Sequence, residues 1–258
     1  MQNLALSEGL LKHATIHGVR LSDFSIEFSD TVSFLTLTET HRQVRIELID
    51  TVDRPESSVA NYGVSLAEGD FSLSVETRFV SENSSIVINA SLEALEDTQI
   101  QDFVIRMKFS KENIASASIK GTQYQHRDSE IYRQFKTREA SLTTKENHCI
   151  LITRTAASFG EDTEAHMYIR DSGDFWIVHA RLFPTRDCKN NWLRWINRFF
   201  WLAFSPQVSN AVKSVGILQK FLWYRTERRG KKSMQLQLIG LIPLKKGQVI
   251  SQQVQLSF

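Results

Sequence analysis

Apolar and polar residues alternate along most of this chain. The pattern is clearest in FSLSVETRFV (71–80), SSIVINASLEAL (84–95) and QDFVIRMKFS (101–110). Because successive side chains of a strand point to opposite faces, a period of two predicts half-buried β-strands. In the third stretch the phenylalanines fall on the apolar face, so Arg106 and Lys108 take the opposite face.

Turn-prone polar segments separate about a dozen such runs, as expected of antiparallel hairpins. The pattern therefore predicts a mainly β protein, a large antiparallel two-sheet β-sandwich. Sandwiches of this length commonly form one unit, so residues 1–258 are predicted to be a single domain.

Three segments depart from the alternation. Leu4–His13 predicts a short helix near the start of the chain. The aromatic stretch NNWLRWINRFFWLAF (190–204) and the segment Val208–Tyr224 place apolar residues at helical spacing. We therefore expect a short C-terminal helical insertion at about residues 190–228, followed by two closing strands.

The hairpin formed by EAHMYIR and DFWIVHARLF carries the richest chemistry. If Ser172 and Gly173 form a two-residue turn, His166 lies opposite His179 and Glu164 lies opposite Arg181. The other face is then apolar throughout. A three-residue loop with a bulge at Gly173 would shift the register by one and move His179 to the apolar side.

The polar face of this hairpin is the predicted site; it holds Glu164, His166, Tyr168, Arg170, His179 and Arg181. Two imidazoles beside Glu164 have the ligand types of a divalent metal such as zinc. His166 or Tyr168 could instead carry a proton with His179 as its partner, while Arg181 or Arg170 anchors an anionic group. Tyr168 also offers a ring on which a sugar can stack. The competing interpretation is a solvated strand face with a cross-strand ion pair.

A second polar cluster contains Tyr124, His126 and Arg133, together with Arg127, Asp128 and Tyr132. It fits the lining of a groove and equally an exposed loop between strands. The sequence contains no glycine-rich phosphate loop, nucleophile elbow or dinucleotide-binding fingerprint.

Charge is distributed unevenly along the chain. Residues 1–100 carry 16 acidic and 6 basic side chains, whereas residues 181–258 carry 2 and 14. Either the acidic and basic ends attract each other in the fold, or the basic C-terminal part binds an anionic partner. Trp192, Trp195 and Phe199, with Arg228 and Arg229, suit contact with an anionic membrane surface or a partner protein, including a second copy. The same aromatic face could close one end of the sandwich.

Two cysteines and the lack of an apolar leader indicate a cytoplasmic protein, with peripheral membrane contact as a further option. Nucleic acid is disfavoured because the isoelectric point of about 8.5 is modest and no binding module is present. The predicted function is binding or processing of a polar, anionic ligand such as a glycan on a sandwich face. The alternative is a non-catalytic interaction module that uses residues 190–232. The sequence leaves open whether the protein is an enzyme. No cofactor is expected, and a divalent metal at Glu164, His166 and His179 is the alternative.

Overall fold

The computed structural model describes residues 2–16, 18–30, 33–38, 44–125, 132–135, 137–172, 174–184, 222–228, 231–236 and 241–258. Within these ranges the regular elements are β-strands and two short 3-10 turns, Ser81–Asn83 and Lys111–Asn113. The strands are β1 (Gln2–Ser7), β2 (Leu10–Ile16), β3 (Val19–Ser29), β4 (Phe34–Thr36), β5 (Arg45–Arg54), β6 (Ser57–Leu66), β7 (Gly69–Val80), β8 (Ser85–Ala94), β9 (Thr98–Ile100), β10 (Asp102–Ser110), β11 (Ile114–Ile119), β12 (Thr122–Gln125), β13 (Tyr132–Phe135), β14 (Glu139–Thr144), β15 (Cys149–Ser158), β16 (Thr163–Ser172), β17 (Phe175–Pro184), β18 (Leu222–Arg228), β19 (Lys231–Leu236), β20 (Ile242–Leu244) and β21 (Val249–Ser257).

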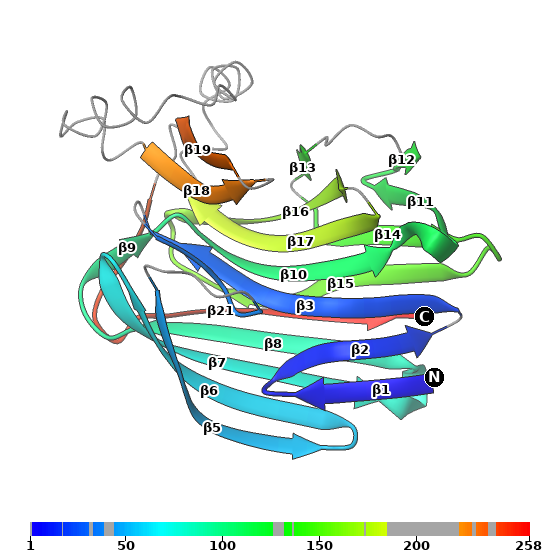
Figure 1. Cartoon of the computed structure of the whole chain (residues 1–258), viewed down its shortest axis with the longest axis horizontal. Helices are drawn as coiled ribbons and strands as arrows, with labels where there is room; N and C mark the ends of the chain where they lie inside the picture. Colours follow the sequence, from blue (N-terminus) through cyan, green and yellow to red (C-terminus); the bar gives the residue numbers. More distant parts are fainter. Residues whose placement is uncertain are drawn as a thin grey trace.

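Two large antiparallel sheets form the body of the molecule, which confirms the predicted mainly β class. The first sheet has the strand order β1-β2-β3-β10-β17-β16-β13, with β4 added to β3. The second has the order β12-β11-β14-β15-β21-β8-β7-β6-β5. Figure 1 shows the sheets as two layers. β9 pairs with β20 and β18 pairs with β19 in two small additional ladders.

The space between the sheets is filled by the apolar positions of the alternating strands. In β6 every second residue is buried, and the partner strand β7 follows the same rule. Phe28 of the first sheet meets Phe71 of the second edge to face, with ring centroids 5.4 Å apart. Burial of these rings together with the Leu, Ile and Val side chains of both layers supplies the driving force for stacking the sheets.

The predicted helix at Leu4–His13 is wrong, because β1 and β2 form a hairpin there. The turn between them, Glu8 and Gly9, has positive φ at both residues, as a tight two-residue hairpin turn requires. The second sheet holds this turn in place: the Tyr62 hydroxyl donates to the Glu8 carbonyl at 2.7 Å, and the Gly9 N–H donates to Ser58 Oγ at 2.6 Å. These long-range contacts decide the local structure.

The C-terminal part of the predicted helical insertion is also strand. Leu222–Arg228 and Lys231–Leu236 pair as the antiparallel hairpin β18–β19, so residues 222–224 do not end a helix. The segment LWYRTER contains Trp223, Tyr224 and Thr226, and aromatic and β-branched residues favour strands. Residues 185–221 lie outside the described ranges, and with them the aromatic stretch 190–204. Within the described ranges no helix has the length and hydropathy to cross a membrane.

The acidic first part of the chain meets the basic last part at Asp97. Its carboxylate accepts from the Lys245 ammonium at 2.9 Å and from the Lys246 backbone N–H at 3.0 Å. The backbone hydrogen bond, followed by the bond to Lys245, lowers the pKa of Asp97. This contact joins the β20–β21 turn to the turn before β9, which agrees with the expected attraction between the two ends.

Two glycines at positive φ provide a matched test of how tightly the β1–β2 turn packs. Gly9 has φ +72°, and a Cβ there would lie 2.5 Å from the Val75 carbonyl oxygen, whereas Gly121 has φ +74° and open space around it. We expect Gly121→Ala to lower the free energy of unfolding by about 1 kcal/mol through backbone strain alone. Gly9→Ala should cost at least about 2 kcal/mol, because β7 backbone must also move. Urea unfolding of both variants checks this; equal losses would contradict the close packing of the turn.

Candidate functional site

The candidate site lies on the face of the first sheet that points away from the core. Phe103, Ile105 and Met107 of β10 belong to the core, so Arg106 and Lys108 point to the other side, as predicted. The strand register places Arg106 between His179 of β17 and Ser25 of β3. Side chains from three strands that are distant in sequence therefore meet on one face.

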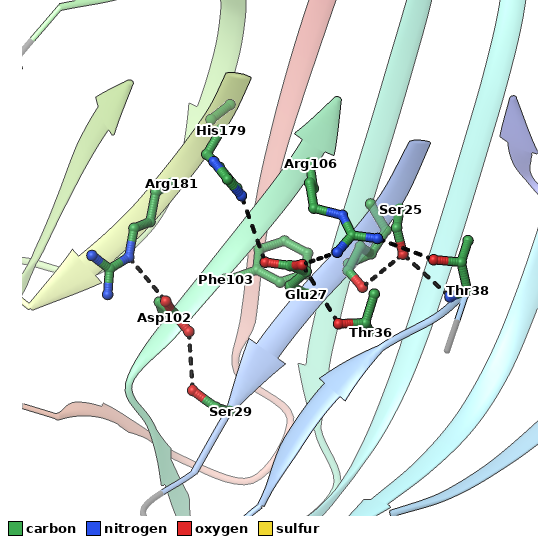
Figure 2. A network of polar contacts seen from close by, with 12 residues as sticks. Ser25, Glu27, Ser29, Thr36, Thr38, Asp102, Phe103, Arg106, His179 and Arg181 are labelled. Carbon is green, nitrogen blue, oxygen red and sulfur yellow. Dashed lines mark hydrogen bonds and ion pairs between the residues drawn. The ribbon is translucent and has the colours of Figure 1, made fainter. Parts of the chain in front are cut away.

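Four ionisable residues form a continuous line across this face, which we call the Glu27 network: Asp23, Arg106, Glu27 and His179. Figure 2 shows three of them, Arg106, Glu27 and His179. Arg106 Nη1 lies 2.8 Å from Glu27 Oε1, and Arg106 Nη2 lies 3.7 Å from Asp23 Oδ2. Glu27 Oε2 lies 3.8 Å from His179 Nε2. The line runs inward from the surface, since the exposed fraction of the side chains falls from 36% at Asp23 to 9%, 6% and 2% at Arg106, Glu27 and His179.

Hydroxyl groups hold the charged groups of the network in place. Thr36 on β4 donates to Glu27 Oε1 at 3.5 Å, and Arg106 Nη2 donates to Thr38 Oγ1 at 3.2 Å. β4 pairs with β3, so Thr36 at the end of β4 and Thr38, two residues further on, lie close to Glu27 and Arg106. Desolvated charges need such partners, because an unpaired buried charge costs several kcal/mol.

Two further cations of this face, Lys108 and Arg181, are also paired with carboxylates. Lys108 pairs with Asp23, and Arg181 Nε lies 2.9 Å from Asp102 Oδ2. Ser29 donates a further hydrogen bond to Asp102 at 3.1 Å. Together with the Arg106–Glu27 pair, these contacts make the face rich in hydrogen-bonding groups but close to electrically balanced.

Aromatic rings form a second feature of the face. The Tyr168 ring stacks on the His179 imidazole, with centroids 4.2 Å apart and an interplanar angle of 14°. Phe183 contacts both the His166 ring, at 4.4 Å, and the Arg181 guanidinium, at 5.1 Å. Glu164, Tyr168 and Arg181 remain partly exposed, so they form an accessible rim around the buried network.

The β16–β17 hairpin confirms the predicted division into faces but corrects the register. Ser172 pairs with Phe175, so the two linking residues are one position later than predicted. His166 therefore lies opposite Arg181, and Tyr168 lies opposite His179. An offset of two leaves every side chain on its predicted face. The bulged alternative is wrong, since Met167 pairs with Ala180 rather than His179.

The new register separates the proposed metal ligands. His166 Nε2 lies 3.1 Å from Glu164 Oε2, while His179 faces Glu27. Among the residues that the structure describes, no three His, Cys, Asp or Glu side chains come together to hold a metal ion. The expected cross-strand pair of Glu164 with Arg181 is replaced by Glu164–His166 and Arg181–Asp102 contacts.

The second predicted cluster is divided between the sheets. Tyr124 lies on β12 at the edge of the second sheet, whereas Arg133 lies on β13 at the edge of the first. His126 lies outside the described residues. The partner-contact residues Trp192, Trp195, Phe199 and Arg229 also fall outside them, and Arg228 ends β18. Their predicted roles stay predictions.

Glu27, Asp23, Asp102 and Arg106 were not among the predicted site residues, although the face on which Arg106 lies was predicted. Glu27 did leave a signal, because it is the one acidic residue in FSIEFS, the second half of β3, whose other residues are Phe, Ile and Ser. Its partners could not be inferred, since the order β3-β10-β17 joins strands that are far apart along the chain.

Comparison of the sequence with protein-family models and with curated proteins finds no match. Among solved structures, a putative aldose 1-epimerase from Escherichia coli K12 is 10% identical, with 82% of this chain and 68% of that chain covered and a TM-score of 0.46. A galactose mutarotase related enzyme from Lactobacillus acidophilus is 8% identical, with coverage of 82% and 70% and a TM-score of 0.42. The Slr1438 protein from Synechocystis sp. PCC 6803 is 8% identical, with coverage of 95% and 73% and a TM-score of 0.36. Similarities at this level do not assign a function to the chain.

A double-mutant cycle measures the buried ion pair at the centre of the network. Glu27→Gln alone leaves the Arg106 charge without its closest carboxylate and should lower the free energy of unfolding by about 3–5 kcal/mol. Glu27→Gln/Arg106→Met should recover at least about 1 kcal/mol of that loss. The exposed pair Arg45–Glu47, changed in the same way, is the control and should show a coupling near zero. If the loss of stability in the double variant equalled the sum of the losses in the two single variants, the pair would not be a desolvated ion pair.

Proposed function

We propose that the protein binds a sugar on the outer face of its first sheet and that Glu27 and His179 exchange protons with it. The observation that carries this proposal is the Glu27 network, which leads from partly exposed Asp23 to buried His179. A strand face turned away from the core is normally solvated, and its charged groups normally stay in water. Ionisable groups that are desolvated and held in a fixed arrangement are typical of sites that bind or transform a ligand.

The balance of charge favours a neutral, hydroxyl-rich ligand over an anion. Arg106, Lys108 and Arg181 each have a carboxylate partner. An anionic ligand would have to compete with these carboxylates, whereas hydroxyl groups can donate to carboxylate oxygens and accept from guanidinium N–H groups. A sugar presents several such hydroxyls on a compact ring.

The stacked pair of Tyr168 and His179 supports the same ligand class. Tyr168 is half-buried, so its ring links the accessible rim to the deep end of the network. Aromatic rings provide flat apolar surface on which the C–H face of a sugar can pack, and the phenol adds a hydrogen-bonding group. Binding sites for small molecules commonly combine such rings with a few fixed polar groups.

The pairing of a carboxylate with an imidazole suits proton transfer. Glu27 and His179 lie 3.8 Å apart, so a sugar that reaches both buried groups can give a proton to one and take a proton from the other. Interconversion of the anomers of a reducing sugar needs only these two transfers: a proton leaves the anomeric hydroxyl and another reaches the ring oxygen as the ring opens. The reverse transfers close the ring and restore both groups.

Polarimetry with a panel of neutral reducing monosaccharides and uronates tests this function. The protein should accelerate anomer interconversion of at least one neutral sugar, and the uronates should be poorer substrates. His179→Gln and Glu27→Gln should each lower kcat by roughly 100-fold or more, since proton transfer by a positioned group contributes that much. Tyr168→Ala should mainly raise KM.

Two controls separate chemistry from folding. Glu47→Gln removes an exposed carboxylate on β5 and should leave the rate unchanged. If Glu27→Gln unfolds, Glu27→Gln/Arg106→Met removes both charges and keeps the test possible. Full activity in folded His179→Gln, or no acceleration of any sugar in the panel, would refute the proton-transfer role; no saturable binding of any sugar would refute the proposed function.

A further inference from the structure

Arg154 is a buried arginine on the core side of the molecule. It lies on β15 in the second sheet, and 4% of its surface is exposed. Its guanidinium crosses to the first sheet, where Nη2 donates to the carbonyl oxygens of His166 at 2.6 Å and Arg181 at 3.4 Å. These two residues form a cross-strand pair of β16 and β17. Arg154 thus links the two layers through the interior between the sheets.

The charge of Arg154 is not balanced by the part of the chain that the structure describes. No carboxylate there lies within ion-pair distance, and the Nε and Nη1 atoms are buried without a hydrogen-bond partner. Arg106 is buried to a similar degree but pairs with Glu27 at 2.8 Å. An unpaired buried guanidinium is among the most unfavourable groups that a protein interior can contain.

Linking the sheets does not explain this charge. Gln252 on β21 makes the same kind of connection with a neutral side chain, since its Nε2 donates to the carbonyls of Phe103 and Ala180 at 3.1 Å each. Ala180 directly precedes Arg181, so both connections reach the same part of β17. A glutamine suffices for this role, which leaves the positive charge of Arg154 to be explained.

A second guanidinium adds to the local positive charge. Arg138 directly precedes β14 and is exposed. Its backbone carbonyl accepts a hydrogen bond from the Arg154 backbone N–H at 2.8 Å. Burial first, and then repulsion from Arg138, lower the pKa of Arg154 to about 10. The buried cation of Arg154 is therefore close enough to the exposed cation of Arg138 to be repelled by it.

We propose that Arg154 and Arg138 bind a small oxyanion of the phosphate class at this end of the sandwich. Such an ion supplies the missing negative charge and several acceptor oxygens, which suit donors on more than one edge of a guanidinium. The site lies on the core side of the β16–β17 backbone, opposite the face that carries the Glu27 network. It is therefore independent of the proposed sugar site, and either can fail alone.

Isothermal titration with inorganic phosphate, at constant ionic strength and with chloride as the reference anion, tests the proposal on the wild-type chain. Phosphate should bind at one site per chain and raise the midpoint of thermal unfolding as its concentration increases. Arg138→Gln is an exposed change that should preserve folding and weaken binding roughly tenfold through loss of one nearby charge. Arg154→Met should abolish the heat of binding, and Arg154→Lys should retain part of it.

Arg78→Gln is the matched control, because Arg78 is also an exposed arginine of the second sheet and its loss changes the net charge equally. Its phosphate affinity should equal that of the wild type. Absence of saturable phosphate binding by the wild-type chain would overturn the proposal, and so would equal weakening by Arg78→Gln and Arg138→Gln. Both results would leave the sugar site on the opposite face unaffected.

Discussion

The ion pair between Glu27 and Arg106 is the interaction on which the functional face depends. Both side chains lie on the face of the first sheet that points away from the core, yet both are buried. Either charge left there without the other would lower the stability of the protein by several kcal/mol. Through this pair β3 and β10 are joined by side chains as well as by their backbone ladder. Arg106 also reaches Asp23, Glu27 also faces His179, and the His179 ring stacks on the Tyr168 ring. The position of the proposed proton-transfer group therefore follows from one desolvated pair. The same physical rule makes Arg154 notable, because it is buried without such a partner among the described residues.

The faces of the strands could be predicted from the sequence because alternation is a local property. The outward position of Arg106 and Lys108 follows from the phenylalanines beside them, and the structure agrees. The polar face of the β16–β17 hairpin is likewise as predicted, although its register is offset by two residues. An even offset changes cross-strand partners without moving a side chain through the sheet. For this reason His166, Tyr168, His179 and Arg181 share one face, while the metal geometry that depended on direct His166–His179 pairing is lost.

Features that depend on distant contacts could not be predicted. Glu27 meets its partners because β3 lies beside β10 and β10 beside β17, an order that local patterns do not encode. Residues Leu4–His13 form a hairpin because Tyr62 and Ser58 of the second sheet hold the turn at Glu8 and Gly9. Residues 222–228 form a strand that pairs with β19, although they were predicted to belong to a helical insertion. In each case tertiary contacts outweigh a modest local preference, which is the usual limit of sequence patterns.

The central claim, that a sugar reaches the Glu27 network, is tested most directly by nuclear magnetic resonance of the histidine rings. The chain contains seven histidines, and selective labelling with a His179→Gln reference assigns the ring signals of His179. His148, exposed at the turn between β14 and β15, is an internal control on the other sheet. Titration with a neutral reducing sugar should shift the His179 signals in a saturable manner and leave those of His148 unchanged. A sugar that saturates the protein while the His179 signals stay fixed would contradict the account.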